Sequence, residues 1–495
     1  MLNLYLNFKN KLFGQGTQSK IISGILWSFI GTIISRGFIL LSLFLVARFL
    51  SVEDYGKVSI IRSFITTFTL FSLGSFGITA TKYLALYANN DEKTASEIFS
   101  LTRIIVFATS FITLIFSIAF KKYLTVKIIG DPSLENEFVV SLIAIFFAAL
   151  NGLQTGALTG LESFKSSSIV NIVNGFLTLP IVIYGAKFYG TFGVITALAI
   201  VNFLIWICSA YYLLKETKKH HIYFTLKNLK KHWNTVLHFS LPSFLSSLML
   251  SPVVLICNTI MINNLSKGYE QLAYYNAAFN YSQLGLVLVG ILGQVFYPYS
   301  MKFFEKNNKK FDFIDLVNPY FVSIFISLPI LFFPDVFASF YGAKYENFDN
   351  YLSITFIVFS LIMNSQTLGV ARYYAASNNM WIGFVGNLIW GIIAILLSQL
   401  LVDYGAYGRA LAFTLSYIVN TINTLYLLPK LFKKKIFNLD VLSNGYNLLI
   451  LLVLVINALF YYYITDSYWI RGIAFILSNI VILYIFYKWY LSKAK

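Results

Sequence analysis

The amino-acid sequence predicts an all-α, polytopic membrane protein. Of its 495 residues, 58% are hydrophobic and only 12% are charged, whereas a soluble domain carries roughly 25% charged residues. Apolar runs longer than about eighteen residues, nearly free of charge, recur along the whole chain, as bilayer-spanning helices require. A transmembrane β-barrel would instead alternate apolar and polar residues, and segments such as 448–463 are apolar on every face. The pattern therefore favours helices.

The apolar runs predict about fourteen transmembrane helices, with boundaries good to a few residues. We place them at residues 21–46, 57–81, 99–120, 137–160, 167–186, 191–214, 240–262, 272–298, 315–334, 350–371, 380–401, 407–429, 446–464 and 469–489. The first run is too long for a cleaved signal peptide and has no convincing cleavage site. We expect it to remain as the first helix.

Basic residues between the apolar runs predict the topology. The N-terminus, the even-numbered loops and the C-terminal tail hold about 25 Lys and Arg residues, and the odd-numbered loops hold about 10, Arg409 and Arg471 among them. Because cytoplasmic loops are enriched in Lys and Arg, both termini are expected in the cytoplasm, with the chain in the inner membrane. The net charge of +17 is spread over short patches, which argues against nucleic acid as a partner.

A short internal repeat suggests two halves. Tyr189-Gly190-Thr191-Phe192-Gly193 and the helix after it recur 215 residues later, beginning with Tyr404-Gly405-Ala406-Tyr407-Gly408. Six predicted spans per half make the repeats parallel, as in alternating-access transporters. The predicted organisation is a cytoplasmic N-terminus (1–20), an N-lobe (21–214), a basic amphipathic cytoplasmic linker (215–239), a C-lobe (240–430), and two further helices with a cytoplasmic tail (431–495).

The linker carries aromatic and leucine residues interleaved with lysines, which is typical of a segment lying on the membrane surface. It also holds His220, His221, His232 and His238, and histidine clusters can bind metal. We expect no carboxylate or cysteine to accompany them, so the interfacial interpretation is favoured. The two cysteines, Cys208 and Cys257, fall within predicted spans and imply neither a disulfide framework nor a metal site.

Catalytic patterns are absent from the sequence. It contains no phosphate-binding P-loop, no metal-ligand spacing and no nucleophile–His–acid set that would sit together. A polysaccharide polymerase would need a large extracytoplasmic loop, and none is present. We therefore expect no enzyme, no cofactor and no metal ion, and transport is the function class that remains.

Two arginines within predicted spans are the leading candidates for substrate binding. Arg36 lies near the middle of the first span and Arg62 lies inside the second. A guanidinium at bilayer depth costs at least about 2.5–3.5 kcal/mol, and no span carries an acidic residue in its middle. Positive charge without a counter-ion suits an anionic substrate, phosphate in particular. Alternatively, each side chain snorkels to an interface or bonds backbone carbonyls.

Weaker candidates are Lys82 and several amides. Lys82 lies at a cytoplasmic helix end, where a simple anchor is the competing interpretation. Asn258, Asn276, Asn280 and Gln283 fall in the seventh and eighth spans. Amides can bind sugar hydroxyls, but they also hold helices together. The glycines at 152, 156 and 160 form a ridge that predicts close helix packing rather than a site.

The segment Ala47-Arg48-Phe49-Leu50-Ser51-Val52-Glu53-Asp54-Tyr55-Gly56, after the first span, resembles the hallmark of bacterial polysaccharide and O-antigen flippases. That family belongs to the multidrug, oligosaccharidyl-lipid and polysaccharide exporter superfamily. Ala273-Tyr274-Tyr275-Asn276-Ala277-Ala278, opening the eighth span, is similar to the second-half counterpart of this motif. Gly160-Leu161-Glu162-Ser163-Phe164-Lys165 and Tyr297-Pro298-Tyr299-Ser300 also fit the family.

The resemblance implies two six-helix lobes in a V shape plus two C-terminal helices. It implies an undecaprenyl-pyrophosphate-linked oligosaccharide repeat unit as cargo, for O-antigen, capsule or exopolysaccharide synthesis. A cationic cavity is a family feature, and Arg36 and Arg62 are the best-placed matches. Membrane lipids, a polysaccharide polymerase and a chain-length regulator are the implied partners, with H⁺ or Na⁺ as the coupling ion.

Two alternatives belong to the same superfamily. A cation-coupled multidrug exporter would carry an acidic residue in the first span, and this span has none. A lipid II flippase shares the fold and the charge pattern, although its cavity is usually richer in arginine.

Overall fold

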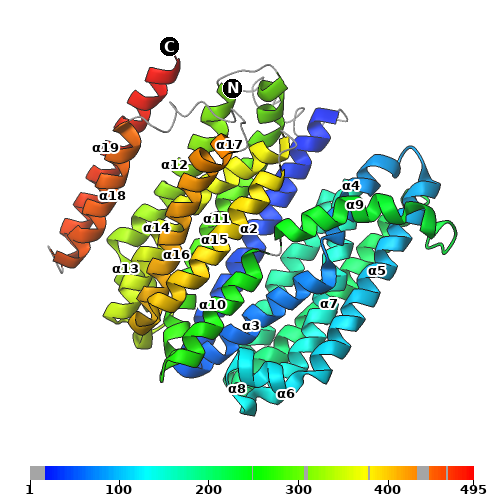
Figure 1. The fold of residues 1–495 in the computed structure, drawn as a ribbon, viewed down its shortest axis with the longest axis horizontal. Helices are drawn as coiled ribbons and strands as arrows, with labels where there is room; N and C mark the ends of the chain where they lie inside the picture. Colours follow the sequence, from blue (N-terminus) through cyan, green and yellow to red (C-terminus); the bar gives the residue numbers. More distant parts are fainter. Residues whose placement is uncertain are drawn as a thin grey trace, which may run out of the picture. The chain divides into compact units, whose positions relative to one another are not determined.

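The computed structural model describes residues 17–247, 249–305, 310–376, 380–431, 445–463 and 467–494. Within these ranges every regular element is helical, which confirms the all-α prediction (Figure 1). Seven of the described helices are long and apolar enough to cross a membrane, or eight if one bent pair is a single span. The chain is thus a multi-pass membrane protein, and the number of about fourteen spans stays a prediction.

The chain divides into two compact units, Met1–Thr259 and Ile260–Lys495. The helices that begin in the first unit are α2 (Thr17–Phe49), α3 (Val52–Leu73), α4 (Phe76–Tyr87), α5 (Glu92–Ala119), α6 (Lys121–Leu124), a π-helical turn (Thr125–Ile129), a 3₁₀ turn (Pro132–Leu134), α7 (Glu135–Gly160), α8 (Phe164–Lys219), α9 (Leu229–Ser247) and α10 (Leu250–Asn264). Within this unit α8 packs along both α2 and α7, and α7 also contacts α3, α4 and α5. The unit boundary falls inside α10, and the predicted lobe and linker boundaries stay predictions.

Small residues set the face that α2 presents to α8. A Cβ placed on Gly31 would lie 2.8 Å from Ser168 Cβ, and one on Gly175 would lie 2.7 Å from Ser35 Cα. The two backbones approach this closely only because the contact residues are small. Successive residues of a helix are turned by about 100°, so Arg36 points away from the face on which Ser35 meets α8.

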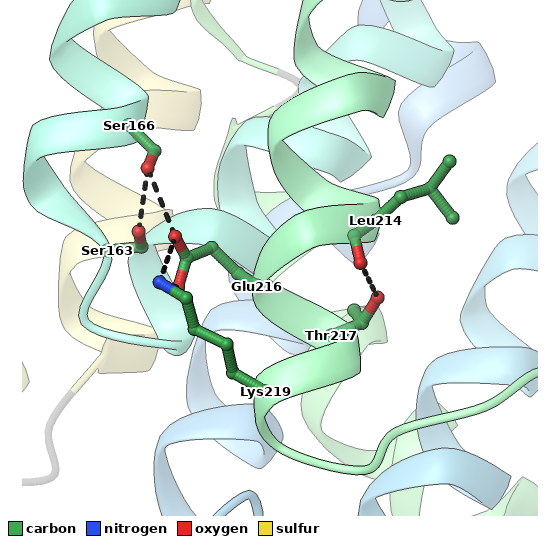
Figure 2. Close-up of polar contacts among 6 residues, drawn as sticks. All are labelled: Ser163, Ser166, Leu214, Glu216, Thr217 and Lys219. Atoms are coloured by element: carbon green, nitrogen blue, oxygen red, sulfur yellow. Dashed lines mark hydrogen bonds and ion pairs between the residues drawn. The ribbon is translucent and has the colours of Figure 1, made fainter.

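Helix α8 consists of two arms that correspond to the predicted spans 167–186 and 191–214. Its 56 residues are interrupted at Gly190, whose φ of 58° and ψ of −140° are not helical. Near the two ends of α8, Ser166 donates a hydrogen bond to Glu216 (3.4 Å), which also pairs with Lys219 (2.9 Å) (Figure 2). This contact between its first and last turns shows that the arms run antiparallel.

The second predicted span is bent. Helices α3 and α4 meet at 44°, and α3 ends at Gly74, which has a left-handed φ of 53°. Helix α4 then packs closely on α7, where a Cβ on Gly160 would lie 2.6 Å from the carbonyl oxygen of Thr81. Thr81 donates its hydroxyl to the carbonyl of Gly156 (2.7 Å). The prediction that the α7 glycines serve close helix packing is therefore confirmed.

The predicted span 240–262 is divided between α9 and α10, which is a difference from the sequence prediction. Helix α9 ends at Ser247 and α10 begins at Leu250. Pro252 lies in the first turn of α10, where the backbone N–H that proline lacks would have no partner within the helix. If α9 continued through this position, the helix would lose a backbone hydrogen bond. Proline therefore favours a helix start at this position.

The linker is docked on the first unit through polar contacts. His232 Nε2 lies 2.8 Å from Glu97 Oε2, and Asn228 donates to the other carboxylate oxygen at 2.9 Å. Tyr83 donates its hydroxyl to the carbonyl of Thr235 (3.0 Å). The expectation that no carboxylate accompanies the histidines was wrong, because the partner comes from α5, far away in the sequence.

The helices and helical turns of the second unit are α11 (Gly268–Glu305), α12 (Lys310–Phe332), α13 (Pro334–Ser339), a turn at Ala343–Tyr345, α14 (Phe348–Ala376), α15 (Met380–Leu400), a turn at Val402–Tyr404, α16 (Gly405–Ile422), a π-helical turn (Asn423–Leu427), α17 (Leu428–Leu431), α18 (Gly445–Tyr463) and α19 (Tyr468–Ala494). Helix α14 packs on α11, α12 and α16, and these helices run alongside one another in Figure 1.

The last two helices pack on each other and on α12. Arg471 of α19 donates to Asp335 of α13 at 2.9 Å, so an ion pair fixes one end of α19 against the rest of the unit. Along α19, Ile473, Ile476 and Ile480 are exposed. This apolar outer face is what a helix in contact with lipid requires.

Candidate functional site

The segment that carries the family resemblance forms the turn from α2 into α3. Ser51 caps α3: its hydroxyl accepts from the backbone N–H of Asp54 (3.0 Å) and donates to the Asp54 carboxylate (2.7 Å). Leu50 and Tyr55 are buried at 3% and 1% exposure. A side-chain cap of this kind is worth about 1 kcal/mol. The motif therefore fixes the start of α3, the helix that carries Arg62.

Arg36 of α2 and Arg62 of α3 are near one another in the first unit. Arg36 is exposed and Arg62 is half-buried, and Arg62 is close enough for its charge to act on the Arg36 guanidinium. No carboxylate among the described residues forms an ion pair with either side chain. Two like charges without a counter-ion make an electropositive patch on apolar helices.

Asn258 joins this region from α10. It is fully buried, and its Nδ2 donates to Ser63 Oγ at 3.0 Å, one residue beyond Arg62. Thr67, one turn further along α3, donates to the carbonyl of Ser251 (3.1 Å). The Asn258 Oδ1 has no hydrogen-bond partner in the described part of the chain. The structure therefore brings Asn258 to the helix of Arg62, and the amide oxygen of Asn258 remains without a hydrogen-bond donor among the described residues.

Lys82 makes a different contact. Its ammonium lies 3.8 Å from the centre of the Phe239 ring on α9, and its side chain is exposed. A cation over an aromatic face is a stabilising arrangement in itself. Lys82 thus contacts the linker helix, and its role as an anchor or as a substrate-binding residue stays a prediction.

The other predicted amides lie on one face of α11 in the second unit. Asn276 donates to the carbonyl of Leu272 (3.0 Å), one turn earlier in the same helix. Asn280 donates to the hydroxyl of Tyr341 (3.2 Å), and Gln283 is exposed. Asn280 therefore has a structural partner, whereas Gln283 is accessible.

The sequence analysis missed one polar residue in each unit. Ser63 carried no signal, because a serine in an apolar helix is common and its partner is 195 positions away. Arg409 was assigned to a loop, but it lies inside α16 at 2% exposure. Among the described residues no group of three His, Cys, Asp or Glu side chains could hold a metal ion.

Residues 21–304 match the family described as polysaccharide biosynthesis protein, which is more than half of the chain. The chain belongs to this family. A curated relative from Shigella flexneri, described as a putative O-antigen transporter, is 24% identical over 291 residues. The match covers 56% of this chain and 66% of that relative, slightly less than two thirds of its length.

Solved structures identify the fold. The lipid II flippase MurJ, in an inward closed conformation, aligns with a TM-score of 0.70 at 19% identity, covering 94% of this chain and 99% of that chain. An inward-facing multidrug resistance transporter of the MATE family aligns with a TM-score of 0.67 at 15% identity, covering 83% and 99%. The family match confirms the predicted relation to polysaccharide biosynthesis proteins, and the structural matches confirm the predicted fold. The descriptions of these proteins name transporters and a flippase.

Proposed function

We propose that the protein is a flippase that moves a lipid-linked oligosaccharide across the inner membrane by alternating access. The cargo is an undecaprenyl-pyrophosphate-linked repeat unit for O-antigen, capsule or exopolysaccharide synthesis. Both termini lie in the cytoplasm. A polymerase and a chain-length regulator act next, and H⁺ or Na⁺ is the candidate coupling ion.

The observation that carries the proposal is the pair of guanidinium groups on α2 and α3. Two nearby cations with no carboxylate partner among the described residues suit a ligand that brings two negative charges of its own. A diphosphate fits this requirement, because each guanidinium can bind phosphate oxygens with two parallel hydrogen bonds. A cationic drug would be repelled by the same patch.

Amide side chains suit the sugar portion of such a ligand. The buried Asn258 donates to Ser63, the residue after Arg62, and its Oδ1 has no partner among the described residues. An amide oxygen accepts hydrogen bonds from sugar hydroxyls. Gln283 of α11 is an exposed amide on the second unit. We assign the arginines to the diphosphate and Asn258 to a sugar contact, and Gln283 stays a separate candidate for a sugar contact in the second unit.

Two other cargoes follow from the superfamily. A lipid II flippase shares the diphosphate chemistry, so the same arginines would serve. A cation-coupled multidrug exporter needs a carboxylate inside a span, and the first span has none. The lipid II flippase is therefore the closer alternative.

The proposal is tested in a strain that lacks this protein. Surface glycan and lipid-linked oligosaccharide on the cytoplasmic leaflet are measured after complementation with wild type, Arg36→Ala, Arg36→Lys or Lys187→Ala. Lys187→Ala removes an exposed cation outside the candidate site and is the matched control. Flipping through the arginine pair predicts that wild type and Lys187→Ala restore surface glycan. Arg36→Ala should leave lipid-linked units inside.

Each contrary result identifies a different error. Normal surface glycan together with changed drug sensitivity in the deletion strain would replace the flippase with a drug exporter. Loss of peptidoglycan precursor transport instead of the surface glycan would indicate lipid II as the cargo. Full restoration by Arg36→Ala would leave the function in place and remove the arginine from the site.

A further inference from the structure

Arg409 is a buried cation in the second unit. Its side chain is 2% exposed, and its Nη1 donates to the hydroxyl of Ser398 on α15 at 3.3 Å. No carboxylate of the described residues forms an ion pair with it. A guanidinium keeps its proton under all ordinary conditions, so the positive charge remains within the protein and needs compensation.

Aromatic rings contact the guanidinium of Arg409. Its Cζ lies 4.8 Å from the ring centre of Tyr275 on α11 and 4.8 Å from that of Phe413 on α16. Such contacts stabilise a cation, but a ring face supplies no acceptor for N–H groups that lie in the guanidinium plane. A ligand for these donors must therefore approach along the edge of the group.

The two nitrogens left over form one such edge. Nε and Nη2 are both buried, and neither has a hydrogen-bond partner among the described residues. Their N–H bonds run parallel and form the side-on fork with which arginine binds anions bidentately. Buried donors are nearly always satisfied in proteins. The missing partner at Arg409 is therefore an acceptor that both donors can share. Because both nitrogens are buried, the space beside them is small, which favours a monatomic anion over phosphate.

The local fold does not require a cation at this position. In the internal repeat Arg409 corresponds to Val194, which is 1% exposed and follows the same Tyr-Gly-x-x-Gly turn. Arg409 also lies near the start of α16, where the helix dipole adds positive potential. The first repeat buries an aliphatic side chain at the corresponding place.

We propose that the Nε/Nη2 fork of Arg409 binds one small inorganic anion of halide size, with chloride as the available ligand. Ser398 and the rings of Tyr275 and Phe413 position the guanidinium. The anion neutralises a charge that no described carboxylate offsets. This site belongs to the second unit and goes beyond the proposed function, because its occupancy can be measured without any lipid-linked substrate.

The test uses the purified full-length protein in detergent, with no oligosaccharide present. Equilibrium binding of radioactive chloride is measured against gluconate at constant ionic strength, and thermal unfolding is followed in the same two buffers. Wild type should bind about one chloride per chain, and its unfolding temperature should rise with chloride, because a ligand that binds only the folded state stabilises it. Bromide should compete with chloride, and phosphate should not.

Arg409→Val places the side chain of the first repeat in the second and should abolish both chloride binding and the chloride-dependent shift. Lys187→Ala, which removes an exposed cation of the first unit, should leave both unchanged. Unchanged binding by a folded Arg409→Val would overturn the proposal. The proposal would also be overturned if wild type bound no chloride, because the fork would then be assigned to water. Displacement of the bound chloride by phosphate would overturn it as well.

A second variant keeps the test decisive if Arg409→Val does not fold. Ser398→Ala removes the hydroxyl that Nη1 contacts but keeps the charge, and it should weaken chloride binding about threefold or more. Unchanged affinity in Ser398→Ala, together with unchanged bromide competition, would count against Arg409 as the ligand. Anomalous scattering from bromide in crystals of the wild type should place the ion beside Nε and Nη2, and a position elsewhere would refute the assignment.

Discussion

Gly190 and Gly405 have the same unusual backbone conformation, with φ and ψ of 58° and −140° in the first and 59° and −135° in the second. Both occupy the same place in the repeated Tyr-Gly-x-x-Gly turn. A Cβ on Gly193 or on Gly408, the second glycine of each turn, would lie 2.6 Å from the Cβ of the tyrosine that opens it. The internal repeat predicted from the sequence is therefore confirmed at this turn.

The two turns differ in what surrounds the first glycine, and this predicts unequal effects of Gly→Ala. A Cβ on Gly190 would meet open space, whereas one on Gly405 would collide with the side chain of Gln271. That side chain also accepts the backbone N–H of Ala406 at 2.7 Å. Gly190→Ala should cost only the backbone strain of about 1–3 kcal/mol, and Gly405→Ala should cost more. Thermal unfolding of the purified variants measures both.

Gly290→Ala is the control for these two variants, because Gly290 is within α11 and a Cβ there meets nothing within 4 Å. It should leave the unfolding temperature unchanged or raise it slightly, since alanine favours a helix over glycine. An equal loss in Gly190→Ala and Gly405→Ala would show that the Gln271 contact contributes nothing.

Arg36 and Arg62 should act together on the cargo. If both guanidinium groups bind one diphosphate, each single Arg→Ala change should reduce transport about 10- to 100-fold, as expected for the loss of a charge-assisted hydrogen bond of about 1.5–3 kcal/mol. The double variant should lose less than the product of the two factors, because residues that share a ligand are not additive. Translocation of a fluorescent lipid-linked oligosaccharide in proteoliposomes measures this. Strict multiplicativity would mean that the arginines act at separate sites.

The sequence predicted those features whose causes are local. Apolar runs placed the helices, and the spacing of the glycines on α7 gave its packing face. Features that depend on contacts between distant segments were not visible. Glu97 meets His232 across 135 positions, and Arg409 was counted with the loops because nothing in its neighbours indicated that Tyr275 would cover it. The division between α9 and α10 was missed because the apolar run continues through it.

The hydrogen bond between Asn258 and Ser63 predicts a modest coupling of α10 to α3. Ser63→Ala leaves the buried Nδ2 of Asn258 without its acceptor, and interhelical hydrogen bonds in membranes contribute about 0.6 kcal/mol on average and about 1.7 at most. We expect Ser63→Ala and Asn258→Ala each to lower the unfolding temperature. The decrease in the double variant should be smaller than the sum of the two single decreases. An additive double variant would show that the two side chains do not interact.

The Glu97–His232 contact predicts how firmly the linker is held. Both side chains are buried, at 5% and 9% exposure, and Asn228 donates to the same carboxylate. Glu97→Ala removes this carboxylate and leaves the buried His232 and the exposed Asn228 without their partner, so the linker should open more often. Trypsin cleavage after the exposed Lys227 should then be faster, because proteolysis follows the population of the open form.

Glu97→Gln is the matched control, since its amide oxygen still accepts a hydrogen bond from Asn228 or His232 while the charge is lost. We expect cleavage rates in the order wild type, Glu97→Gln, Glu97→Ala. Cleavage of Glu97→Gln as fast as Glu97→Ala would assign the docking to charge rather than to hydrogen bonding. Equal rates in all three would show that Ser96 and Ser100, which accept the backbone N–H groups of Tyr223 and Thr225 at 3.1 and 3.0 Å, are sufficient to hold the linker on α5.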